Sequence, residues 1–316
     1  MADIDFNLFE SIETALIGDT GMFFSRGMQI FGYITPLVTT GLGVYIILQA
    51  YHYYNKGFDE SILDISRRMV GWIVIAMLAL NANNYQKIAK LAYQLPDEIA
   101  SVINGTELKG NVLDASRKNS DEMMESLHKK AEKPLDGLGK LGKYVLFAFN
   151  MTMSKIFAAI LLLVIFVYYL ITKIFLLMVL MVGPIFLSCL FFPTLRQWGM
   201  QWINQIGNYT ITIVLYVVLA NIQKNFFDST LLGFMRSIDN NVAMGGSPAV
   251  LVSYSSMMFV MFALSTIAFI LAAIKVPTLS SALTGGATIE SGIRSLSHFA
   301  NPILKNLGRS NSMTPK

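Results

Sequence analysis

Charged residues are scarce in this chain of 316 residues, because Asp, Glu, Lys and Arg together make up 14% of it. A soluble globular domain carries about 25%. Hydrophobic side chains make up 54% of the chain, and the mean hydropathy is +0.53. This balance excludes a disordered chain, a coiled coil and most soluble enzymes. Several charge-free runs approach or exceed the roughly 20 residues of a bilayer crossing, so we predict an all-α, polytopic membrane protein.

The chain also has few of the residues that metal and catalytic sites use. Cys189 is the single cysteine, which excludes an intrachain disulfide and a cysteine-rich metal site. His52, His128 and His298 lie far apart, without metal-binding spacing. No P-loop, nucleophile-elbow, dinucleotide-binding or zinc motif occurs. We therefore expect no metal, no cofactor and no catalytic residue.

A self-contained pump is not indicated either. No Asp or Glu lies in the core of a confident apolar span, where a proton-coupled carrier would use one. The two halves of the chain do not share matching interrupted helices, which is the pattern of an inverted-repeat transporter. These absences favour a protein that works with partners, although an autonomous transporter or channel of another family stays as the alternative.

Five membrane spans are predicted, near 28–50, 69–88, 144–182, 206–223 and 250–274. The third is drawn as one long helix because no Gly, Pro or polar cluster lies between 160 and 182, and the first helix breaker is Gly183-Pro184. Such a helix is about 58 Å long, roughly twice the hydrocarbon thickness, so it crosses once and projects beyond the membrane. The apolar piece after Pro184 is then re-entrant or interfacial; the alternative is two separate spans, 156–172 and 174–192.

The chain divides into five segments on this basis. Residues 1–27 form an amphipathic exterior segment, with apolar residues three or four apart, and 28–84 hold the first two spans. Residues 85–143 form the sizeable exterior segment, with ten basic and nine acidic residues. Residues 144–274 hold the long apolar helix and the last spans, and 275–316 form a tail.

The distribution of basic residues sets the predicted orientation. The connection 55–68 holds three basic residues and the tail holds five, so both are placed in the cytoplasm. The number of crossings between them is then even. One span, 28–50, precedes the cytoplasmic connection, so the N-terminus lies outside the membrane, in the periplasm if the host is a diderm bacterium, and the C-terminus lies inside.

Polar residues near the spans are the candidates for a substrate path or a subunit interface. Asn81, Asn83 and Asn84 either cap a helix at the membrane surface or face other helices within the bilayer. Lys155 and Lys173 are 18 residues apart, about 27 Å along a helix. They either extend their amines to the two membrane surfaces, or one of them lines a polar path or pairs with an acid on a neighbouring subunit.

Two tryptophans come after the helix breaker. Trp198 and Trp202 are four residues apart and therefore share one helix face, close to Arg196. Tryptophan is enriched at the headgroup level of membranes, so both are predicted to lie in an interfacial aromatic belt.

The order of these features resembles a known family. Gly183-Pro184, the run PTLRQWGMQW at 193–202 and the run VPTLSSALTGG at 276–286 are similar to the polytopic inner-membrane subunit of type IV secretion and conjugation systems, the VirB/TrbL type. The resemblance covers about 28 to 290 and is only positional over 85–143. It implies that Arg196, Trp198 and Trp202 belong to a cytoplasmic connection and that Pro277 to Gly286, including Gly285, begin the cytoplasmic tail.

The resemblance also implies a function and partners. Such a subunit is a membrane platform that assembles as a homo-oligomeric ring, suspected to be a pentamer. It touches membrane lipid, periplasmic stalk or pilus-tip proteins and core-complex proteins. It helps pass single-stranded DNA with its attached relaxase, or effector proteins, while partner ATPases supply the energy. The near-neutral charge of 85–143 argues against a continuous DNA-binding surface there.

Overall fold

The computed structural model describes residues 8–17, 20–56, 62–104, 110–135, 141–243 and 247–284. These residues form helices and no strand, which confirms the all-α prediction. The helices are α1 (Leu8–Ile17), α2 (Thr20–Lys56), α3 (Ile62–Ala79), α4 (Ala82–Asn104), α5 (Gly110–Leu135), α6 (Leu141–Met181), α7 (Gly183–Cys189), α8 (Arg196–Ala243) and α9 (Pro248–Thr284).

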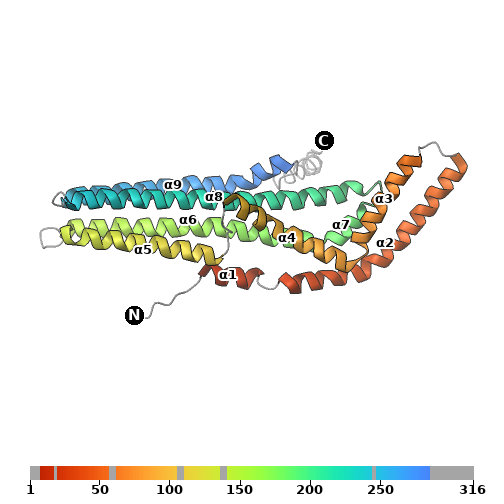
Figure 1. Cartoon of the computed structure of the whole chain (residues 1–316), viewed down its shortest axis with the longest axis horizontal. Coiled ribbons are helices and arrows are strands. Elements are labelled where there is room, and N and C mark those ends of the chain that lie inside the picture. Colours follow the sequence, from red (N-terminus) through yellow and green to blue (C-terminus); the bar gives the residue numbers. More distant parts are fainter. Residues whose placement is uncertain are drawn as a thin grey trace, which may run out of the picture.

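Three long helices, α6, α8 and α9, lie side by side and form an elongated bundle (Figure 1). Apolar residues of all three meet in its centre, and Tyr169, Tyr216, Leu231 and Phe262 are fully buried. With 41 residues, α6 is about 62 Å long, about twice the hydrocarbon thickness. One half of the bundle can therefore lie in a membrane only if the other half projects from it.

The long third helix is confirmed, because α6 runs without interruption to Met181. It stops where the sequence predicts, since Pro184 has no amide hydrogen and cannot continue the ladder of backbone hydrogen bonds. The short helix α7 comes next and ends at Cys189. The alternative with a separate span at 156–172 is wrong.

Residues 224–243, which follow the predicted end of the fourth span at 223, are helical, so that predicted end is corrected. Helix α8 continues to Ala243 because Phe227, Leu231, Phe234 and Ile238 recur at helical spacing and are buried in the bundle. The last helix is also longer than predicted: α9 runs through Lys275 and Pro277 to Thr284. The polar residues at these positions led us to predict that the two helices end there, but packing against neighbouring helices extends both α8 and α9.

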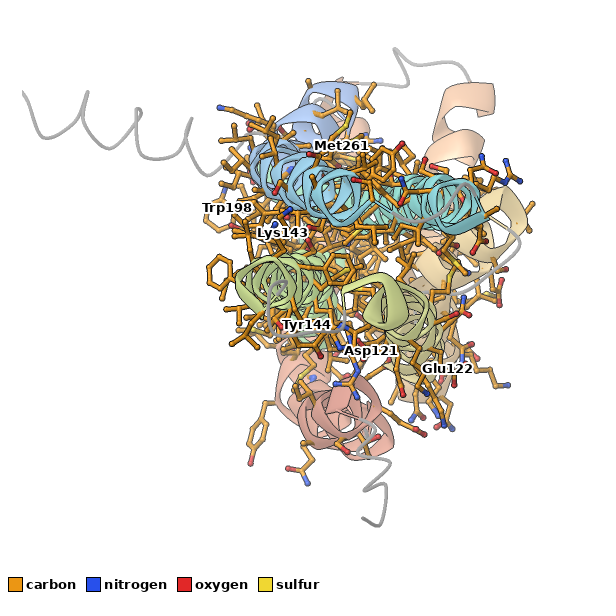
Figure 2. All side chains as sticks on the ribbon, turned by 90° about the vertical axis from the view of Figure 1, so that its left-hand side faces the viewer. Asp121, Glu122, Lys143, Tyr144, Trp198 and Met261 are labelled. Carbon is orange, nitrogen blue, oxygen red and sulfur yellow. The ribbon has the colours of Figure 1, made fainter. Side chains whose placement is uncertain are left out.

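The charged helix α5 covers the first half of α6 (Figure 1). Met124 and Leu127 are buried, and His128 contacts the rings of Tyr144 and Phe147. Figure 2, which looks along the bundle, shows Asp121 and Glu122 on the outer side of α5. The predicted extramembrane segment thus includes a helix with one apolar face on the bundle and one polar face in water.

One ion pair of α5 illustrates its exposure. Glu125 and Lys129 lie 2.8 Å apart, one helical turn from each other, and both are exposed. The hydrogen bond from Lys129, together with its charge, lowers the pKa of Glu125, and the same contact raises the pKa of Lys129. An exposed pair of this kind contributes little to stability.

Helices α2, α3 and α7 gather at the opposite end of the bundle, and α4 runs back from there across α8 and α6 (Figure 1). Within the described residues, α2, α6, α8 and α9 are long and apolar enough to cross a membrane. The predicted second span is different. It contains only a shorter apolar stretch, Met69–Leu78, and its helix ends at Ala79 rather than continuing to 88.

Candidate functional site

A buried ion pair joins α4 to α6. The Lys173 amine lies 2.7 Å from a carboxylate oxygen of Asp97, and their side chains are 6% and 16% exposed. The hydroxyl of Tyr169 donates a hydrogen bond to the other oxygen of Asp97 at 3.1 Å. The rings of Tyr93 and Tyr169 both lie near the ammonium, 5.4 Å and 5.2 Å from it. Each charge therefore has partners that offset its removal from water.

This geometry overturns one interpretation of Lys173. Its amine does not extend to a membrane surface, because it is buried and paired. The other interpretation paired Lys173 with an acid on a neighbouring subunit. The structure does pair Lys173 with an acid, but that acid, Asp97, belongs to the same chain. Lys155 is half-buried on the same helix and no ion pair for it is identified, so its role stays a prediction.

A second polar joint lies at the break between α6 and α7. In a regular helix the carbonyl of Leu180 would accept a hydrogen bond from residue 184, but Pro184 has no donor. The hydroxyl of Tyr85, on α4, donates to that carbonyl instead. The indole nitrogen of Trp202, on α8, donates to the neighbouring carbonyl of Val179 at 2.8 Å. Two aromatic donors thus satisfy the end of α6.

Glycine is required at 183 for these two rings to approach. A Cβ atom added to Gly183 would overlap the hydroxyl of Tyr85 and lie 2.6 Å from the Trp202 ring. Gly183 and Pro184 are both buried. The Gly-Pro pair therefore acts twice: proline ends the helix and frees a carbonyl, and glycine admits the side chains that bind the freed groups.

In α9, too, a proline leaves a backbone carbonyl without its helical donor, and a side chain of another helix donates to it. Pro277 removes the donor that would reach the carbonyl of Ala273, and the buried hydroxyl of Tyr216, on α8, donates to that carbonyl at 3.2 Å. Nearby, Ser280 donates to the backbone carbonyl of Asn208 at 2.7 Å. Helix α9 therefore passes through its proline without a break and stays attached to α8.

Polar side chains also join α6 to α9 in the half of the bundle that α5 covers. The buried amide of Asn150 donates to the hydroxyls of Ser255 at 3.2 Å and Ser256 at 2.9 Å. Such bonds fix the register of two long apolar helices, because sliding by one turn would leave the amide without its partners.

The break between α3 and α4 is capped by asparagine. The side chain of Asn81 accepts a hydrogen bond from the backbone amide of Asn84 at 3.2 Å, as a helix N-cap does. The side chain of Asn84 donates to the carbonyl of Met77 near the end of α3. Asn81 and Asn84 therefore bond the two helix ends at this break, and Asn83 is exposed beside them; the position of all three relative to the membrane stays a prediction.

The two tryptophans lie in different environments. Trp198 is 57% exposed, whereas Trp202 is 9% exposed and bonded to α6. The belt interpretation is wrong for Trp202 and stays a prediction for Trp198 and its exposed neighbour Arg196. Gly285 and Gly286 lie outside the described residues.

Trp202 is expected to contribute more to stability than Trp198. Replacing Trp202 with Phe removes the donor to Val179, and leaving a buried carbonyl without its partner costs about 1–3 kcal/mol. Trp198→Phe removes no identified hydrogen bond and is the matched control. Thermal unfolding of both purified variants in the same detergent measures the difference; equal losses would contradict the placement of Trp202.

The residues that complete these joints were not identified from sequence. Tyr85, Asp97, Tyr169 and Tyr216 lie far in sequence from the groups that they bind. The sequence did contain a partial signal. A proline within or at the end of a helix leaves the carbonyl four residues earlier without its backbone donor, so Pro184 and Pro277 predict that the carbonyls of Leu180 and Ala273 need another donor. The identity of the side chain that reaches this carbonyl depends on which helices are neighbours.

Taken together, these contacts join helices that are distant in sequence. Among the residues that the structure describes, no group of three His, Cys, Asp or Glu side chains could hold a metal ion. The polar contacts described above connect α4, α6, α8 and α9 and fix the positions of these helices relative to one another.

Comparison with known families identifies the chain. The TrbL/VirB6 plasmid conjugal transfer protein family matches residues 42–273, which is most of the sequence. The chain belongs to this family. The matched region extends from α2 into α9, contains the Gly183-Pro184 joint and ends shortly before Pro277.

Individual relatives agree with this assignment. The chain is 23% identical over 250 residues to the type IV secretion system protein VirB6 of Bartonella quintana (strain Toulouse), covering 75% of this chain and 73% of that protein. It is 22% identical over 249 residues to VirB6 of Bartonella henselae (strain ATCC 49882 / DSM 28221 / CCUG 30454 / Houston 1), with the same coverage of both chains. The TrbL/VirB6 chain described here is thus a type IV secretion subunit, and the prediction from resemblance is confirmed at that level.

Proposed function

We propose that this TrbL/VirB6 chain is a channel and scaffold subunit in the inner membrane of a type IV secretion, or conjugation, machine. It helps single-stranded DNA with its relaxase, or protein substrates, cross that membrane, and it supports assembly of the stalk or pilus. One observation carries the proposal. Helices α6 and α8 each contain a charge-free stretch that suits a membrane, and each continues beyond it into the half of the bundle that the charged helix α5 covers. Such helices link the membrane to an exterior assembly.

Exposed apolar residues support assembly into a ring of identical subunits. One face of α6 exposes apolar side chains from Val145 to Met178. This row is about 50 Å long, whereas lipid covers about 30 Å. Lipid therefore leaves part of the row uncovered, and a second copy of the chain supplies the missing contact. Five copies are proposed from the family resemblance alone.

The arrangement of the helix ends supports the proposed orientation. The basic residues Lys56, Arg67, Arg68 and Arg196 flank the α2–α3 connection and the start of α8. Figure 1 places these elements at one end of the molecule, opposite the ends where α5 meets α6 and α8 meets α9. The positive-inside rule assigns the basic end to the cytoplasm. The end that carries α5 then faces the periplasm, together with stalk, pilus-tip and core-complex proteins.

Purification from the native host with cross-linking and mass spectrometry tests the proposal. Gentle detergent should recover the chain with secretion ATPases and periplasmic channel proteins, and Lys118 and Lys129 of α5 should cross-link to the periplasmic ones. A lone homo-oligomer that transports solutes in liposomes would favour an autonomous transporter. Cross-links from these two lysines to cytoplasmic proteins would contradict the orientation.

A further inference from the structure

The depth of α4 in the membrane can be deduced from the surroundings of α6. Helix α5 holds five acidic and five basic residues in 26 and, at about 39 Å, covers at least the first half of α6 (Figure 1). A helix with that charge content does not lie in hydrocarbon. The membrane-embedded part of α6 is therefore drawn from its last residues, beyond the reach of α5, where Lys173 is the single charge.

Helix α4 packs against this same part of α6. Tyr85 binds Leu180, and Asp97 binds Lys173 and Tyr169, so α4 runs antiparallel to α6 over these residues. It also crosses α8 (Figure 1), which carries no charge between Arg196 and Lys224. Helix α4 thus lies at membrane depth, although its own sequence is too polar to identify it as a span.

The second crossing is then a broken helix. The apolar stretch Met69–Leu78 of α3 is about 15 Å long, half of the hydrocarbon thickness. Tyr85, just after the break at Asn81, is held at the end of α6. Helix α3 therefore covers one half of the membrane, and α4, which is about 34 Å long, covers the other half and continues beyond it. Interrupted helices at membrane depth occur where the backbone is buried in protein or lines a water-filled cavity.

Three rows of side chains run along α4. The first contains Tyr85, Ala89, Tyr93, Pro96 and Ala100 and is buried against α6 and α8. The second is exposed and apolar, with Ile88, Leu91, Leu95, Ile99 and Val102. The third is exposed and polar, with Lys87, Lys90, Gln94 and Glu98. We call it the α4 polar row. Hydrocarbon cannot cover the α4 polar row without a large cost in free energy.

We infer that the α4 polar row lines a water-filled path through the membrane, along which an extended polypeptide passes. This inference rests on the proposed function, because the path belongs to the assembled ring. The adjacent apolar row faces lipid or a neighbouring subunit. The row carries both signs of charge, Lys87 and Lys90 against Glu98, with the amide of Gln94 between them. A path built for nucleic acid would instead present an uninterrupted basic surface to the phosphates.

Cysteine accessibility tests the path. The single native cysteine is first removed by Cys189→Ser, and single cysteines are introduced at the polar row (87, 90, 94, 98) and at the apolar row (88, 91, 95, 99). Cells that carry the intact machine are treated with a charged, membrane-impermeant thiosulfonate, and the remaining thiols are counted with a maleimide polymer. Ala89→Cys in the buried row is the unreactive control.

We expect the polar row to react at least tenfold faster than the apolar row, with the period of a helix. Equal reactivity of both rows would place α4 in bulk water and overturn the inference. Protection of both rows would place the α4 polar row in a protein interface and overturn it too. Co-purification with the secretion machinery is scored separately, so failure of the path is distinguishable from failure of the proposed function.

A photo-cross-linking residue at position 90 tests which substrate passes. Adducts with the transported polypeptide, formed only during active transfer, support the assignment. Adducts with nucleic acid alone, or no substrate adduct while position 90 remains accessible, would overturn the polypeptide as the occupant of the path.

Discussion

Replacing Asp97 with leucine while Lys173 is kept is expected to destabilise the protein by about 3–5 kcal/mol, the cost of leaving one charge of a buried pair uncompensated. Lys173→Met is expected to cost a similar amount, because Asp97 would then be buried with only the Tyr169 hydroxyl as its identified donor. The pair joins α4 to α6, so either change should also loosen α4. Thermal unfolding in detergent and the steady-state amount in the membrane measure the loss.

The double variant Asp97→Leu with Lys173→Met distinguishes a lost charge pair from lost packing. It removes both charges and retains side chains of similar volume, and such replacements are often neutral or stabilising. We expect it to recover most of the stability that each single change loses. A double variant as unstable as the sum of the two single ones would contradict the pairing.

Gly183→Ala is expected to produce the second large effect. The added methyl group overlaps the Tyr85 hydroxyl and crowds the Trp202 ring, so both donors must move away from the end of α6. Forcing one group into a packed core costs about 1–3 kcal/mol, and loss of the bond to Leu180 adds to this. Thermal unfolding is the measurement, and Tyr85→Phe should reproduce part of the loss because it removes the donor without adding volume.

Gly207→Ala is the matched control for this prediction. Gly207 also lies in a helix, but nothing lies within 4 Å of a Cβ added there. Alanine is favoured over glycine in a helix by about 1 kcal/mol, so this variant should be as stable as the native chain or more so. If Gly183→Ala behaved in the same way, the close approach of Tyr85 and Trp202 would be wrong.

Much of the architecture was predictable from local sequence. The absence of any helix breaker between 160 and 182 correctly indicated one long helix, and Gly183-Pro184 correctly marked its end. The failures occurred where polarity was taken as the end of a helix. Residues 224–243 carry charges and amides, yet their apolar residues recur at helical spacing, and burial against the bundle extends α8 over them.

The candidate site was predictable only in part. Gly183, Pro184 and Trp202 were singled out, and the structure brings them together around the end of α6. Lys173 was recognised as unusual, but its partner Asp97 lies far earlier in the chain, in a helix that looked wholly exterior. Trp198 and Trp202 were assigned one environment because they are four residues apart; neighbouring helices cover only one of them.

The sequence by itself determined the class of the protein, because the number and length of charge-free runs depend directly on composition along the chain. It also determined where the helices break, because proline removes a backbone donor wherever it occurs. Only the tertiary structure decided how those breaks are repaired and how the buried charge is neutralised. The donors from Tyr85, Trp202 and Tyr216 and the carboxylate of Asp97 come from helices distant in sequence, and a polar contact across such a distance depends on which helices pack together.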